Sequence, residues 1–125
     1  MTRATGPLQA ALRAQAKGLH ACEAATELLI GHDSWLHRAD FVDDFVDTDA
    51  GPSDGIVMSA IDWPEAITAL DAGRLPCSGG ERRILQIAAS LADGVPVDLR
   101  DALTGLDSTN TNLVAAAVLH ANGRK

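Results

Sequence analysis

Apolar side chains recur at helical spacing along most of the chain, and residues that begin or end helices separate the apolar runs. From Pro7 to Ile30 the apolar stripe includes Leu8, Leu12, Leu19, Cys22 and Leu29. A stripe of this period predicts one long amphipathic helix over 7–30. Gly18 lies inside it and weakens the helix by about 1 kcal/mol relative to alanine. The glycine also permits close packing or a kink at that point.

Five further helices are indicated by start and stop residues. Ser78 and Glu81 have the spacing of a capping box, in which each side chain accepts from the other's backbone amide. The helix that follows ends at the Asp93–Gly94 stop. Asp33 is interpreted as the cap of the second helix, and other aspartates precede later apolar runs. The predicted helices after the first cover 34–46, 63–72, 79–93, 99–106 and 108–121.

The segment between the second and third helices has a different pattern. Residues 48–55 (TDAGPSDG) are rich in turn-forming residues and predict a loop. Residues 56–61 are short and apolar, and their pattern fits either a strand or a buried turn of helix. Residues 1–5 are expected to be flexible. Because β-branched and aromatic residues are scarce, we predict a single all-α domain of about six helices, with the long first helix packed on a C-terminal cluster.

Charge is distributed unevenly along the chain. Residues 39–73 hold nine of the seventeen acids and no Lys or Arg, although the whole chain carries a formal charge of −7. This distribution disfavours direct binding of nucleic acid or of an anionic membrane, and it suits a basic protein partner. A solvated acidic face that aids solubility explains the same residues. Two cysteines form no disulfide framework, and no leader or membrane span is evident, so a cytoplasmic location is expected.

A short stretch has a local resemblance to a known family. The string SGGERRILQIAASLADG followed by LTGLDSTN resembles the signature region of ABC-type ATPases. In that family a serine-glycine-glycine loop opens a helix and contacts nucleotide. The chain departs from the family because it lacks the G-x-x-x-x-G-K-S/T phosphate loop and an apolar strand ending in Asp-Glu before Leu103. The resemblance therefore does not imply ATP hydrolysis.

A second resemblance covers most of the chain. The string from EAATELLIGHDSWLHRADFV through LPCSGGERRILQIAASLADGVPVDLRDALTGLDSTNTNLVAAAVLHANG is similar to an uncharacterised family of small proteins of high-GC actinobacteria. Some members are associated with plasmids or integrative elements. The composition, rich in Arg, Ala, Asp, Gly and Val and poor in Lys, agrees with a high-GC source. The resemblance implies an origin and no particular mechanism.

Metal sites can be assembled from the polar residues in three ways. A metal-dependent hydrolase would use His20, His32, Asp33 and an aspartate of 40–47, provided that these ligands converge. A zinc site would use Cys22 and Cys77 with His20 or His37, but the usual paired-cysteine spacing is missing. A calcium loop would use Asp47, Asp49 and Asp54, but Pro52 and Met58 occupy its glycine and acid positions. We predict no metal and no cofactor, and the hydrolase is kept as an alternative function.

The remaining polar and aromatic candidates also have ordinary structural explanations. Ser78, His120 and Asp107 form a catalytic triad on paper, but Ser78 lacks a G-x-S-x-G context. Trp35 and Trp63 each open a helix, and they serve either as core anchors or as interface anchors. We therefore predict a small accessory protein that binds another protein without catalysis; a structural homodimer is a further alternative. The candidate interaction residues are Asp40, Asp43, Asp44, Asp47, Trp35 and Trp63.

Overall fold

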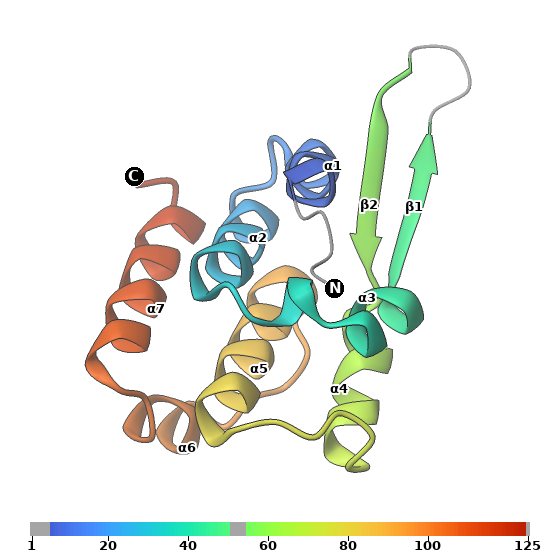
Figure 1. Ribbon diagram of the computed structural model, residues 1–125. Coiled ribbons are helices and arrows are strands. Elements are labelled where there is room, and N and C mark those ends of the chain that lie inside the picture. Colours follow the sequence, from blue (N-terminus) through green and yellow to red (C-terminus); the bar gives the residue numbers. More distant parts are fainter. Residues whose placement is uncertain (1–5, 51–54, 125) are drawn as a thin grey trace.

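The computed structural model describes residues 6–50 and 55–124, and helices dominate this part of the chain (Figure 1). The elements are α1 (Gly6–Ala16), α2 (His20–His32), the 3-10 helix η1 (Trp35–His37), α3 (Ala39–Phe45), β1 (Val46–Ala50), β2 (Val57–Ile61), α4 (Trp63–Asp71), α5 (Gly79–Asp93), α6 (Leu99–Thr104) and α7 (Ser108–Ala121). The prediction of a mainly helical protein is confirmed. The expectation that the chain has no sheet is wrong, because β1 and β2 pair.

The predicted single helix over 7–30 is two helices joined by a tight turn. α1 ends at Ala16 and α2 begins at His20. Gly18 has a φ of +90°, which no residue in a right-handed helix adopts and which glycine tolerates. The Glu23 carboxylate accepts a hydrogen bond from the Gly18 amide at 3.0 Å and holds the turn in place. Gly18 therefore breaks the helix, and α1 runs at a steep angle to α2 (Figure 1).

The second predicted helix, 34–46, is also divided. Asp33 does not cap it: its backbone is left-handed, with a φ of 61°, and its amide donates to the Leu29 carbonyl at the end of α2. Aspartate is one of the few residues other than glycine that accept this conformation. The extended backbone of Arg38 then separates η1 from α3. α3 is only seven residues long, and the chain continues directly into β1.

The two strands form an antiparallel hairpin in which Val46 lies opposite Ile61 and Thr48 lies opposite Ser59. The hydroxyl groups of Thr48 and Ser59 are hydrogen-bonded at 2.8 Å. The loop predicted over 48–55 is therefore wrong for 48–50, which belong to β1, and 51–54 lie outside the described residues, as do 1–5. Of the two structures considered for 56–61, the strand is present over Val57–Ile61.

Helix starts in the second half agree with the sequence. The side chains of Asp62, Ser78, Asp98 and Asp107 each accept from the amide three residues later, at the first residues of α4, α5, α6 and α7. Ser78 and Glu81 form the complete capping box. Gly94 ends α5 in the left-handed conformation. These caps satisfy amide groups that have no partner inside their own helices.

The core is centred on α2, which packs against α5 and α7. Ala24, Ala25, Ala88 and Ala89 are fully buried and allow these helices to approach closely. α1 packs against β2 and α2, so the hairpin is attached to the helical body along one side (Figure 1). Within the described ranges, no helix has the length and apolar character that crossing a membrane requires. The hairpin and α3 together carry five of the acids between residues 39 and 73: Asp40, Asp43, Asp44, Asp47 and Asp49.

Candidate interaction surface

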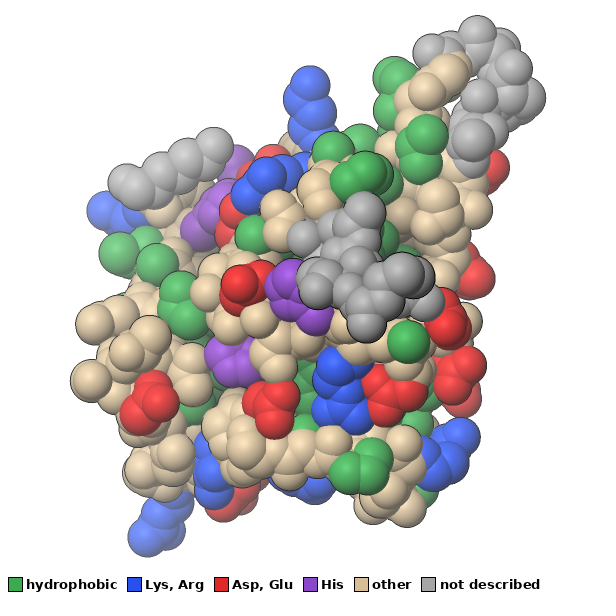
Figure 2. All heavy atoms as spheres, in the orientation of Figure 1, with side chains coloured by type: hydrophobic (Ala, Val, Ile, Leu, Met, Phe, Trp, Pro, Cys, Tyr) green, Lys and Arg blue, Asp and Glu red, His purple; other side chains and the backbone are tan. Residues whose placement is uncertain are grey.

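The predicted acidic residues lie together on α3 and β1. Asp40, Asp43 and Asp44 are exposed on α3, and Asp47 and Asp49 are exposed on β1. Figure 2 shows acidic side chains along the edge of the molecule next to the hairpin. We call the set Asp40, Asp43, Asp44, Asp47 and Asp49 the acidic surface. Its members belong to two consecutive elements, because α3 leads into β1 without a loop.

Little positive charge from the described residues reaches this surface. Arg38 pairs with Asp40, with Nη2 and Oδ2 2.6 Å apart, and its hydrogen bond lowers the pKa of the Asp40 carboxyl. Among the described residues, one further arginine pairs with an acid of residues 39–73. This is Arg82, which pairs with Asp71 on α4. Asp47 and Asp49 take part in none of these pairs. Their charges therefore remain available to a partner.

Trp35 is in the core and not on the surface, so its assignment to the interaction residues is wrong. Its exposed fraction is 0%. The indole N–H donates to the Glu81 carbonyl at 2.9 Å, and its ring lies 5.4 Å from the ring of Phe41. The Arg38 guanidinium lies over the same indole, 4.6 Å from its centroid. Trp35 is thus a core residue that packs against Phe41 and so stabilises α3, the helix that carries part of the acidic surface.

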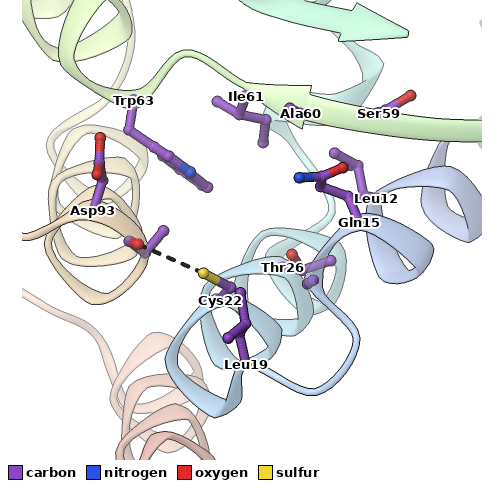
Figure 3. Close-up of a pocket in the computed structure, with 12 residues that line it drawn as sticks. Leu12, Gln15, Leu19, Cys22, Thr26, Ser59, Ala60, Ile61, Trp63 and Asp93 are labelled. Atoms are coloured by element: carbon purple, nitrogen blue, oxygen red, sulfur yellow. Dashed lines mark hydrogen bonds between the residues drawn. The ribbon is translucent and has the colours of Figure 1, made fainter. Parts of the chain in front are cut away.

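Trp63 is half-buried and lines a pocket of about 240 Å³. Figure 3 shows its indole at the edge of the pocket, across from Gln15 on α1 and Cys22 on α2. Asp93 lies at the end of α5 beside it. The other walls are mainly apolar and come from α1, α2 and β2. Trp63 is therefore partly accessible, at a pocket to which no residue of α3 contributes.

The hydrolase ligands do not converge. His20 and His32 are the first and last residues of α2, so the helix rise alone separates them by about 18 Å. His20 Nδ1 lies 3.4 Å from a Glu23 oxygen, and Asp33 binds His37 at 2.6 Å. In the part of the chain that the structure describes, no group of three or more His, Cys, Asp and Glu side chains is placed to hold a metal ion.

The two cysteines lie near opposite ends of α5. The Cys22 thiol donates to the carbonyl of Ala92 at the helix C-terminus, over an S···O distance of 3.6 Å. Cys77 precedes the N-terminus, and burial raises the pKa of its thiol. A helix of fifteen residues spans about 22 Å, so the thiols cannot share a zinc ion. For the calcium loop, Asp47 and Asp49 are in a strand, and Asp54 lies outside the described residues.

The triad of Ser78, Asp107 and His120 is not assembled either. Asp107 caps α7 and His120 lies thirteen residues further along the same helix, about 20 Å away. His120 Nε2 is 3.1 Å from a Glu23 oxygen. Ser78 is occupied as the cap of α5. Ser78 and Asp107 therefore each cap a helix, and His120 contacts Glu23 on α2.

One polar cluster was only partly foreseen in the sequence. Beyond the capping box, the Glu81 carboxylate also accepts from the Ser34 hydroxyl, which comes from the turn before η1. This hydrogen bond is the main reason that the pKa of Glu81 is lowered. The capping spacing predicted the local part of the cluster. No spacing rule could identify Ser34, because it is 47 residues away.

His32 is expected to make the protein less stable as the pH falls. Burial lowers the pKa of its imidazole, and Nδ1 is buried without a hydrogen-bond partner among the described residues. Below the ordinary histidine pKa of about 6.5, His32 takes up a proton in the unfolded chain, whereas in the folded protein it takes up that proton only at lower pH. The free energy of unfolding should therefore decrease from pH 7.5 to 5.5.

Urea denaturation at these two pH values, followed by circular dichroism, measures this change. The His32→Asn variant should lose part of the pH dependence. Glu81 and Asp40, whose pKa values are lowered from the carboxyl range, lose their contributions only at more acidic pH. An identical decrease in the variant and the original protein would contradict the assignment to His32.

Comparison of the chain with protein-family models, curated proteins and solved structures found no match.

Proposed function

We propose that this protein is an interaction protein that binds a basic protein partner through the acidic surface. The observation that carries the proposal is the placement of Asp44, Asp47 and Asp49, which are all exposed on α3 and β1. A surface with one sign of charge raises the rate of encounter with an oppositely charged partner. The proposal concerns binding and assigns no catalytic residue.

The shape of this region supports the same function. The hairpin extends from the helical body, and α3 lies at its base (Figure 1). Behind the acidic surface, Phe41 and Phe45 anchor α3 in the core with their rings 6.0 Å apart. The acids are therefore presented on a supported element. A rigid charged surface loses little conformational entropy when a partner binds.

The metal-dependent hydrolase is the weaker candidate. Its first two ligands lie at opposite ends of α2, and Asp33 is paired with His37. An enzyme of this kind needs its ligands within a few ångströms of one ion. The acidic surface has no such geometric conflict, which is why we favour binding.

We expect the double substitution Asp47→Asn and Asp49→Asn to slow partner association about fivefold at low ionic strength. The partner is first recovered by affinity purification, and association is then measured by surface plasmon resonance over a range of salt concentrations. Loss of two charges weakens steering, and salt screens what remains. The substituted protein should therefore show a shallower dependence on salt.

The matched control is Asp93→Asn with Asp101→Asn. Both of these aspartates are exposed and lie outside the acidic surface, and the net charge changes by the same amount. The control should associate at nearly the original rate. Equal slowing by both double variants would show an effect of net charge alone, and unchanged rates in both would remove the acidic surface from the binding site.

A further inference from the structure

We propose that the open edge of β1 binds an extended basic segment of the partner as an added antiparallel strand. The segment carries Lys or Arg at two positions separated by one residue. This inference rests on the proposed function, because it specifies how the acidic surface recognises its partner. It is carried by the backbone register of the hairpin together with the placement of Asp47 and Asp49.

The register shows which backbone groups of β1 face outward. The Asp62 amide donates to the Phe45 carbonyl at 2.8 Å, so these residues form a hydrogen-bonded pair at the base of the hairpin. Hydrogen-bonded and non-bonded pairs alternate along an antiparallel ladder. Asp47 and Asp49 therefore bond to β2, whereas the N–H and C=O of Thr48 point away from it.

The side chains agree with this register. Residues opposite each other in a non-bonded pair have closer side chains, and the Thr48 and Ser59 hydroxyls are 2.8 Å apart. β2 lies on the side of α1, and β1 forms the outer edge of the hairpin (Figure 1). Thr48 is exposed. Its amide and carbonyl can therefore pair with a strand that approaches from outside.

Asp47 and Asp49 determine the chemistry of that strand. Their side chains share one face of the hairpin, because they are two residues apart in a strand. In an added antiparallel strand centred on Thr48, the residues opposite both aspartates belong to non-bonded pairs, which have Cα atoms about 4.5 Å apart. Lys or Arg at these two positions would meet the carboxylates directly. The residue between them would pair its backbone with Thr48.

The same geometry disfavours a second copy of this chain at the edge. If two β1 strands paired antiparallel about Thr48, Asp47 of each would lie opposite Asp49 of the other. Like charges directly opposite each other destabilise a strand pair. Charged residues at sheet edges are a common protection against self-association. The edge therefore disfavours pairing with the β1 edge of a second copy and favours pairing with a basic strand.

A seven-residue blocked peptide with lysine at its third and fifth positions tests the inference. Its binding is followed by NMR titration of the full chain and by exchange of the Thr48 amide with solvent. We expect saturable shifts along β1 and slower exchange at Thr48. N-methylation of the peptide's fourth residue blocks the pairing with Thr48 and should weaken binding about tenfold.

N-methylation of the third residue is the matched control, because the amide of that residue points away from β1 in the added strand. It should change the affinity less than about twofold. On the protein side, Thr48→Pro removes the outward amide and leaves the bonds of Asp47 and Asp49 to β2 in place. Thr48→Val loses the hydroxyl alone. Only Thr48→Pro should reduce peptide binding, and the NMR spectrum of each variant checks that it is folded.

The outcomes separate this inference from the proposed function. If both N-methylated peptides bind as well as the unmodified peptide, or if the unmodified peptide does not bind, strand addition is overturned. The acidic surface then still stands if association with the purified partner depends on Asp47 and Asp49. If the rate of partner association is unchanged when these two residues are substituted, the proposed function fails regardless of the peptide result.

Discussion

Trp35→Ala is expected to lower the free energy of unfolding by about 3–5 kcal/mol. The indole is fully buried, it packs against Phe41, and its N–H donates to the Glu81 carbonyl. Truncation removes the largest of the fully buried side chains among the described residues and leaves a cavity. It also removes the donor of that hydrogen bond. The measurement is guanidinium denaturation followed by far-ultraviolet circular dichroism.

The matched control is Trp63→Ala, which removes the same side chain at a half-buried position. Trp63 lies at a pocket that is open to solvent, so less apolar surface is lost from the core. We expect a loss of about 1–2 kcal/mol, in proportion to the smaller buried area. Equal losses in the two variants would contradict the conclusion that one tryptophan anchors the core and the other lies at its edge.

Helix starts were predictable because capping is a local interaction. Asp62, Asp98 and Asp107 each bond to an amide three residues away, and Ser78 and Glu81 form their box within four residues. No tertiary contact is needed to establish such a motif, so the sequence contains the required information. The same logic explains why the length of α5 and its end at Gly94 were correct.

The first half was predicted less accurately because a backbone break at Gly18 interrupts a continuous apolar stripe. Leu12 and Leu19 belong to the same helical period, but Gly18 adopts a positive φ between them. Periodicity counts side chains along the sequence and does not detect a turn between them, and after this turn Leu19 is 60% exposed whereas Leu12 is buried. Asp33 was misassigned for a related reason, since the same residue type caps helix starts and accepts the left-handed conformation at helix ends.

The hairpin depends on pairing between segments that no local rule connects. The end of the helix was predicted at 46, one residue past Phe45, but no local pattern indicates that residues 46–50 form a strand. Only the partner strand Val57–Ile61 makes the extended conformation favourable. Composition identified the acids of the candidate surface. It did not predict that some of them lie on a helix and others on a strand, because the strand depends on pairing with β2.

Leu28→Ala is expected to lower the free energy of unfolding by about 3 kcal/mol. Leu28 is 2% exposed on α2, the helix that packs against both α5 and α7. It also borders a cavity of about 90 Å³ beside Leu113 and Ala117 of α7. Truncation enlarges this cavity, and the cost of a truncated leucine rises with the cavity volume that remains.

Leu19→Ala provides the matched control for this second substitution. Leu19 is 60% exposed in the turn before α2, so its truncation should change stability by no more than about 0.5 kcal/mol. Both variants are compared by guanidinium denaturation under the conditions used for the tryptophan pair. If Leu28→Ala were as mild as Leu19→Ala, α2 could not be the centre of the core.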